Sequence, residues 1–128
     1  KDIHAQIEVV PFCNNKQELI EHYRTIDIFI LPSVVESFGL VMAESMACGC
    51  ALVTTNVGYA KSLTNKEQAL IFKGPDELHM ALKSLIEDSF FLKRIALAGY
   101  EKVQELTWAT ASALITNIYQ NLSRDEPI

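Results

Sequence analysis

The chain has 128 residues, of which 49% are apolar and 21% are charged, and its formal net charge is −5 at pH 7. A chain of this size and composition can bury a hydrophobic core without metal or disulfide support, which excludes a disordered, collagen-like or coiled-coil protein. Nucleic acids and anionic membranes are bound through clustered Lys and Arg. The acidic balance therefore argues against a broad nucleic-acid or membrane footprint.

Three cysteines, Cys13, Cys48 and Cys50, make an odd count, and no second pair or histidine lies at the spacing of a zinc site. We expect them to pack in the core as small apolar side chains, and we expect no metal. We also expect Trp108, at a predicted helix start, to be a packing anchor, since aromatic side chains bury large areas.

Short apolar runs alternate with helical patterns along the chain. This alternation, with runs long enough to be buried on both faces, predicts an α/β fold: a Rossmann-like parallel sheet with flanking helices. We expect one domain over residues 1–122, a frayed tail over 123–128, and a ligand site beyond the carboxyl ends of the strands. The expected strands are 7–11, 27–31, 51–54 and 69–72, with helices at 16–25, 39–48, 74–88, 89–105 and 107–122 and a short turn or helix at 60–64.

One carboxylate stands out in an apolar segment. Between Ser37 and Ala60 the only charged residue is Glu44, and the helix that carries it is too apolar for a solvated face. A buried carboxylate is costly when unpaired, so we expect Glu44 to have a partner. That partner is either a local hydrogen-bond donor, such as the Ser33 or Thr54 hydroxyl, or a ligand such as a ribose diol.

A second carboxylate, Glu36, lies just before the start of the same helix. Free backbone N–H groups and the helix dipole attract phosphate and sugar oxygens to such a helix start. Glu36 could therefore bind a ligand there, or it could simply cap the helix. The residue types alone leave both readings open.

The segment 32–53 resembles the donor-site motif of GT-B glycosyltransferases of the family 4 type. It has a Pro-Ser pair, a Glu, Phe-Gly-Leu, a second Glu, and a Met-Ala-x-Gly turn into a strand; further agreement is found at Glu18-Leu19, Val57-Gly58 and Thr107-Trp108. The resemblance implies the C-terminal, nucleotide-sugar donor-binding domain of a retaining glycosyltransferase. Such an enzyme would transfer a hexose-type sugar from a nucleotide diphosphate sugar to a glycan or lipid acceptor, without a metal or other cofactor.

The resemblance also implies roles for individual residues. Glu36, the candidate catalytic residue, would contact hydroxyls of the donor sugar, and Glu44 would bind the ribose. Main-chain groups in the range 12–14 would lie near the nucleobase. The sugar and diphosphate would face Ser37 and the amides of Phe38, Gly39 and Leu40.

Two departures from the family pattern bear on function. Tyr59 replaces a common second glycine after Gly58, which points to an altered loop near the sugar. The Arg and Lys that clamp the diphosphate in the family are missing, because no Lys or Arg occurs between Thr25 and Ala60. We therefore expect an N-terminally truncated donor domain that is inactive alone, with the acceptor docking on a missing N-terminal domain. The resemblance places such a protein in the cytoplasm, with peripheral contact at the inner face of a membrane and a role in polysaccharide biosynthesis.

Other functions are compatible with the same pattern. A sugar epimerase of the GT-B fold would share the donor site. A phospho-receiver-like module or a subunit-interface domain would share only the α/β architecture, and the receiver reading needs acidic residues that this chain does not place at its strand ends.

Overall fold

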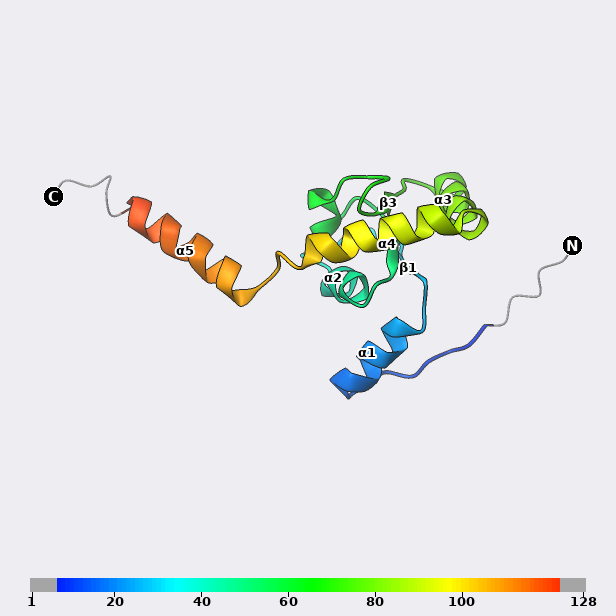
Figure 1. Ribbon diagram of the computed structural model, residues 1–128, viewed down its shortest axis with the longest axis horizontal. Helices are drawn as coiled ribbons and strands as arrows, with labels where there is room; N and C mark the ends of the chain where they lie inside the picture. Colours follow the sequence, from blue (N-terminus) through cyan, green and yellow to red (C-terminus); the bar gives the residue numbers. More distant parts are fainter. Residues whose placement is uncertain (1–6, 123–128) are drawn as a thin grey trace, which may run out of the picture.

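A computed structural model describes residues 7–122, so the predicted frayed tail at 123–128 lies outside the described residues. Three parallel strands form its sheet in the order β1-β2-β3. Strand β1 covers Ile28–Leu31, β2 covers Ala51–Thr54 and β3 covers Leu70–Ile71. The sheet is flanked by helices (Figure 1), which confirms the predicted Rossmann-like α/β class.

The helices follow the strands in the predicted alternation. Three of them begin at side-chain caps: Asn15 accepts from the Gln17 amide, Asp88 accepts from the amides of Phe90 and Phe91, and the Thr107 hydroxyl oxygen accepts from the Thr110 amide. Such caps satisfy N–H groups that have no partner within the helix. The helices are α1 (Lys16–Arg24), α2 (Leu40–Ala47), the short 3-10 helix η1 (Gly58–Ser62), α3 (Pro75–Glu87), α4 (Ser89–Val103) and α5 (Trp108–Leu122).

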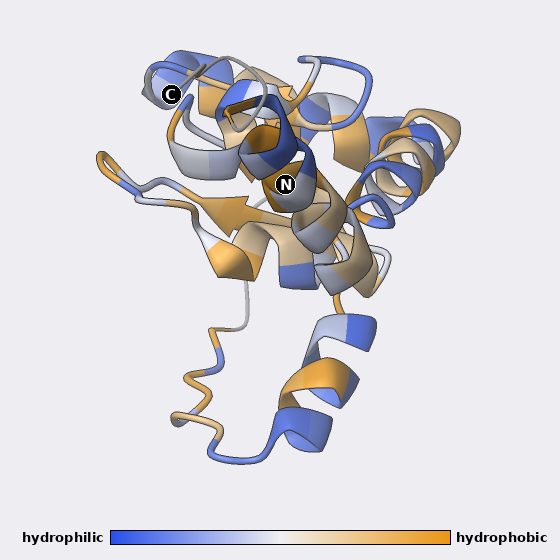
Figure 2. Cartoon of the chain, turned by 90° about the vertical axis from the view of Figure 1, so that its left-hand side faces the viewer, coloured by the Kyte–Doolittle hydropathy of each residue, from blue (hydrophilic) through white to orange (hydrophobic). Residues whose placement is uncertain are grey.

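The core is split into two layers by β2, whose four residues are all buried. Leu52 points to one face, with Met42, Met46 and Tyr59 around it. Val53 and Ala51 point to the other face, where residues of α3 and α4 cover them. Figure 2 shows a hydrophobic strand inside the body and α1 projecting from it. Because β2 is buried on both faces, its sequence shows no alternation of apolar and polar residues.

The turn after α2 brings the chain directly into β2. Gly49 has φ +92, and its N–H donates to Met46 O while the Cys50 N–H donates to Ser45 O. These two bonds form a Schellman motif, in which a left-handed residue satisfies the last carbonyls of the helix. The predicted helix stop at Gly49 is therefore confirmed.

Two expectations about the ends of the chain are wrong. The predicted strand at 7–11 has no regular structure where it is described, and Ile7 is 90% and Val9 86% exposed. A β-prone sequence forms a strand only where a neighbouring strand and a packing surface are present. Trp108, expected as a packing anchor, is 92% exposed, because α5 extends away from the body (Figure 1) and has no buried residue.

The cysteines only partly follow the expectation of core packing. Cys50 is fully buried, whereas Cys13 and Cys48 are half-buried. In the part of the chain that the structure describes, no helix is long and apolar enough to cross a bilayer.

Candidate functional site

Two loops lie side by side at the carboxyl ends of β1 and β2. Thr54 and Thr55, at the end of β2, both donate hydroxyl hydrogen bonds to the loop after β1. The Thr54 hydroxyl donates to Leu31 O at 2.9 Å, and the Thr55 hydroxyl donates to Ser33 O. The loop 32–39 contains most of the predicted site residues. Its beginning is therefore fixed by hydrogen bonds from the end of the neighbouring strand.

Gly58 allows the loop after β2 to approach the loop after β1 closely. Its φ is +50, and a Cβ at this position would lie 2.4 Å from Phe38 O and 3.0 Å from Glu36 Cβ. The next residue, Tyr59, donates its backbone N–H to Phe38 O at 2.7 Å. Because only glycine tolerates both the backbone angle and the close approach, Gly58 lets η1 pack directly behind the site loop.

Glu36, in the loop after β1, is half-buried. The Ser33 hydroxyl donates to Glu36 Oε1 at 2.8 Å, while Oε2 has no hydrogen-bond partner among residues 7–122. The N-cap of α2 is Gly39, in a left-handed conformation and without a side-chain hydrogen bond. Glu36 therefore does not cap the helix, and one of the two readings left open by the sequence is wrong.

The start of α2 is partly open to solvent, although its N-cap, Gly39, is buried. Ser37 and Phe38 are exposed, Leu40 is 66% exposed, and the first turn contains no acidic side chain. The first N–H groups of a helix have no acceptor within it and carry a partial positive charge. Together with the free oxygen of Glu36, this helix start offers both donors and an acceptor to a polyhydroxylated or phosphorylated ligand.

Glu44 lies one turn further along α2 and is exposed, contrary to the expectation that it would be buried with a partner. Helix α2 keeps a solvated face because its buried side chains, including Met42 and Met46, all lie on the opposite side. Glu44 has no hydrogen bond or ion pair within residues 7–122, so neither Ser33 nor Thr54 is its partner.

A hollow of about 280 Å³ separates Glu44 from α1. Its lining is mostly apolar and includes Tyr23 and the cationic side chains Lys16 and Arg24, all three from α1. Burial raises the pKa of Tyr23, and the charge of Glu44 adds to that effect. The range 12–14, expected near a nucleobase, lies just before α1; Phe12 is 87% exposed. Glu36 and residues 37–40 thus form one continuous loop and helix start, whereas Glu44 borders a separate hollow.

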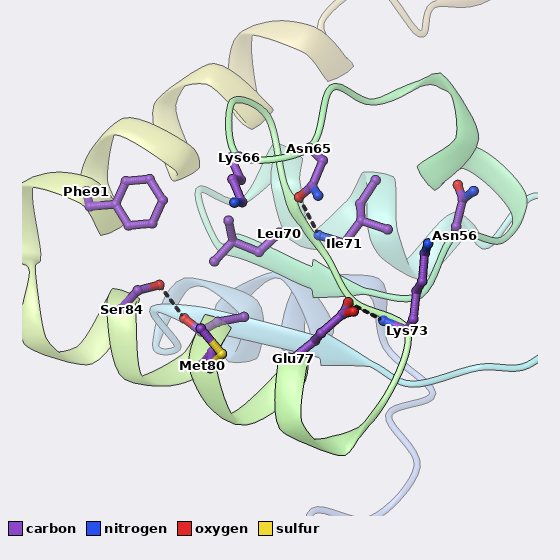
Figure 3. Close-up of a pocket in the computed structure, with 11 residues that line it drawn as sticks. Asn56, Asn65, Lys66, Leu70, Ile71, Lys73, Glu77, Met80, Ser84 and Phe91 are labelled. Atoms are coloured by element: carbon purple, nitrogen blue, oxygen red, sulfur yellow. Dashed lines mark hydrogen bonds between the residues drawn. The ribbon is translucent and has the colours of Figure 1, made fainter.

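A larger groove, about 780 Å³, runs along the outer edge of β3 (Figure 3). It does not include the predicted site residues. Two side chains accept hydrogen bonds from backbone amides along this edge. Asn65 Oδ1 accepts from the Ile71 amide and Glu77 Oε2 accepts from the Lys73 amide, both at 2.9 Å. Within residues 7–122, no three His, Cys, Asp or Glu side chains gather as a metal site.

The comparison with known families identifies the family of the chain. The family profile described as "Glycosyl transferases group 1" matches residues 1–102, which is most of the chain. The chain belongs to this glycosyltransferase family. The resemblance carried by the segment 32–53 is therefore confirmed.

Relatives of this group 1 glycosyltransferase chain agree with the family. It is 30% identical over 106 residues to a D-inositol 3-phosphate glycosyltransferase of Corynebacterium diphtheriae, covering 80% of this chain and 25% of the relative. A D-inositol 3-phosphate glycosyltransferase of Xylanimonas cellulosilytica is 30% identical over 115 residues, covering 88% and 28%. The chain thus spans about a quarter of the length of these curated relatives.

Two solved structures share the fold. The C-terminal domain of a group 1 family glycosyl transferase from Francisella tularensis superimposes with a TM-score of 0.67 at 30% identity, covering 76% of this chain and 51% of that one. Sucrose-phosphate synthase from Thermosynechococcus elongatus gives 0.70 at 25% identity, covering 86% and 29%. The glycosyltransferase chain therefore has the Rossmann-like architecture of a GT-B C-terminal domain.

Some contacts of the site loop are not predicted by the sequence. The sequence suggests Ser33 as a partner for Glu44, whereas the Ser33 hydroxyl donates to Glu36. The sequence gives no sign of the role of Thr55, and the expected effect of Tyr59 on a loop near the sugar stays a prediction; its side chain is buried. Hydroxyl residues at the end of a parallel strand are a usable signal, because they reach the loop that follows the adjacent strand.

Proposed function

We propose that this chain forms the nucleotide-sugar-binding part of a retaining glycosyltransferase. The enzyme transfers a hexose-type sugar from a nucleotide diphosphate sugar to a glycan or lipid acceptor. The observation that carries the proposal is Glu36: a half-buried carboxylate three residues before the N-cap of α2, fixed by Ser33 through one oxygen, with its other oxygen unbonded within residues 7–122. Family membership supports the transferase chemistry.

In this proposal, the donor lies over the carboxyl ends of β1 and β2. Glu36 accepts hydrogen bonds from hydroxyls of the sugar and so orients the reacting carbon. The positive end of α2, with the amides of residues 38–40, stabilises the negative charge that grows on the diphosphate as the sugar leaves. A carboxylate that is already bonded to Ser33 is better placed to orient a sugar than to attack it, so Glu36 acts by contact and positioning.

Glu44 binds the ribose of the donor in the same proposal. It is exposed and borders a hollow that also contains an aromatic side chain and two cations. Carboxylates suit vicinal ribose hydroxyls because both oxygens can accept hydrogen bonds. The hollow between α1 and α2 then takes the nucleoside, about one helical turn from the sugar.

The experiment measures donor binding and turnover by the intact gene product that contains this chain, and by the chain alone. UDP, GDP and ADP are tested for thermal protection, and the matching nucleotide sugars for transfer, hydrolysis or epimerisation. We expect protection by one nucleotide, sugar transfer with retained anomeric configuration by the intact product, and no transfer by the chain alone. Absence of protection by all three nucleotides, or epimerisation without transfer, contradicts the proposal.

A further inference from the structure

Tyr59 contacts the site loop through both its backbone and its ring. Its N–H donates to Phe38 O at 2.7 Å, and its ring stacks on the Phe38 ring with the centroids 5.2 Å apart and the planes at 28°. Tyr59 is 7% exposed and belongs to the core cluster that also contains Met42 and Met46. Phe38, in contrast, is 39% exposed. The stack therefore ties a solvent-facing loop residue to the hydrophobic core.

Phe38 lies between the two parts of the site that must keep a fixed relation. Glu36 precedes it by two residues, and Gly39, the N-cap of α2, follows it directly. No side chain caps the helix start, so the cap itself does not fix the loop. The hydroxyl bonds from Thr54 and Thr55 hold the beginning of the loop, at Leu31 and Ser33. The contacts to Phe38 hold its far end.

The ring of Tyr59, not its hydroxyl, makes this contact. The Tyr59 hydroxyl oxygen is buried and has no hydrogen-bond partner among residues 7–122, and burial raises the pKa of the group. A buried hydroxyl without a partner stabilises nothing and carries a desolvation cost. A phenylalanine at this position would keep the stack and remove that cost.

We propose that Tyr59 is a positioning residue of the donor site: by holding Phe38 through its ring and amide, it fixes Glu36 relative to the start of α2 and so sets the affinity for the nucleotide-sugar donor. The part that concerns affinity rests on the proposed function. The part that concerns the loop does not, because it follows from the packing of Tyr59 and Phe38 alone. The two parts are therefore tested with separate measurements on the same variants.

The first measurement is amide hydrogen exchange of the segment 34–41 in the ligand-free protein. The Tyr59→Leu substitution keeps an apolar core side chain and removes the stack; we expect exchange in this segment to become at least about fivefold faster. Tyr59→Phe should exchange like the wild type. Leu63→Ala is the matched control, because Leu63 is buried in the same cluster and has no stacking contact with Phe38. It should lower the melting temperature but leave the segment within about twofold of the wild type.

The second measurement is the affinity for whichever of UDP, GDP and ADP the wild type binds. We expect Tyr59→Leu to weaken binding about tenfold, and Tyr59→Phe and Leu63→Ala to stay near the wild type. If Tyr59→Leu does not fold, Phe38→Leu removes the same stack from the exposed side and should loosen the segment 34–41 in the same way.

The outcomes separate the two proposals. Unchanged exchange in Tyr59→Leu, equal loosening in Leu63→Ala, or loosening in Tyr59→Phe overturns the positioning role. Unchanged affinity in a Tyr59→Leu protein whose loop has loosened overturns its role in binding. A wild type that binds none of the three nucleotides while Tyr59→Leu still loosens the loop refutes the proposed function and leaves the positioning of the loop standing.

Discussion

The Ser33 hydroxyl donates a 2.8 Å hydrogen bond to Glu36 Oε1, so one oxygen of this half-buried carboxylate is fixed and the other is free. Ser33 is in turn held by Thr55, which donates to its carbonyl oxygen. This chain of contacts runs from the end of β2 to the carboxylate. It explains how Glu36, although it lies in a loop, keeps one orientation. A side chain that positions a sugar must be fixed in this way.

Replacing Ser33 with alanine removes the bond that orients Glu36. We expect the kcat/KM of the intact enzyme to fall about tenfold, because a carboxylate that is free to rotate positions the sugar less often. The free energy of unfolding should change by no more than about 1.5 kcal/mol, the usual worth of one hydrogen bond. Steady-state kinetics and urea denaturation measure the two quantities. Ser112→Ala, at an exposed residue of α5 with no side-chain hydrogen bond among residues 7–122, is the control; an equal loss there would contradict the role of Ser33.

Replacing Glu44 with alanine should separate binding from stability. Glu44 is exposed and has no ion pair within the described residues, so the melting temperature of the ligand-free protein should stay unchanged. The thermal protection by a nucleoside diphosphate should disappear, since the ribose loses its acceptor. Glu67→Ala, an exposed carboxylate distant in the sequence, should leave protection intact. Full protection in Glu44→Ala would refute the ribose assignment.

Gly58 should tolerate no side chain. In Gly58→Ala the new Cβ meets the Phe38 carbonyl at a backbone angle that alanine rarely adopts, and we expect a loss of at least about 2 kcal/mol in the free energy of unfolding. Gly74→Ala is the matched control, because nothing lies within 4 Å of its Cβ position and its φ is −155. Urea denaturation compares them. Equal stability of the two variants would show that the loops do not approach as described.

Truncating an exposed apolar side chain and truncating a buried one should have different effects on stability. Trp108→Ala should leave the melting temperature unchanged, because Trp108 is 92% exposed. Leu85→Ala, at a side chain 1% exposed on α3, should cost about 2–5 kcal/mol through lost burial and a cavity. Calorimetry of both variants tests the contrast, and a large loss in Trp108→Ala would mean that α5 packs on the body.

The thiol of Cys50 should make stability fall at alkaline pH. Burial raises its pKa from 9.0 to about 11, and the thiol contacts Tyr23 O at 3.2 Å. Between these two pH values the unfolded thiol has lost its proton and the folded thiol keeps it, so the free energy of unfolding decreases as pH rises. The slope is at most about 1.4 kcal/mol per pH unit.

A comparison with Cys50→Ala isolates this effect, because the tyrosines whose pKa values are also raised, Tyr23 and Tyr59, remain in both proteins. Denaturation curves across the alkaline range provide the measurement. Parallel pH profiles of the two proteins would contradict the prediction.

Sequence reasoning succeeded where the local pattern and the final packing agree. Strand β2 was predicted with its observed bounds because four buried residues follow a glycine turn, and α3 because Gly74-Pro75 starts it. It failed where the outcome depends on a distant surface. Val9 and Trp108 have apolar side chains, but no element covers them among residues 7–122. The stack of Phe38 on Tyr59 joins residues that no sequence periodicity relates.

The two edges of the sheet differ in a way that limits how the sheet can grow. Along β3, Asn65 and Glu77 already occupy the outward amides of Ile71 and Lys73. Along β1, no hydrogen bond within residues 7–122 occupies the outer side of Ile28–Leu31. Unpaired strand edges accept further strands, whereas capped edges do not. Any additional strand, from the same polypeptide or from another, therefore joins this sheet beside β1.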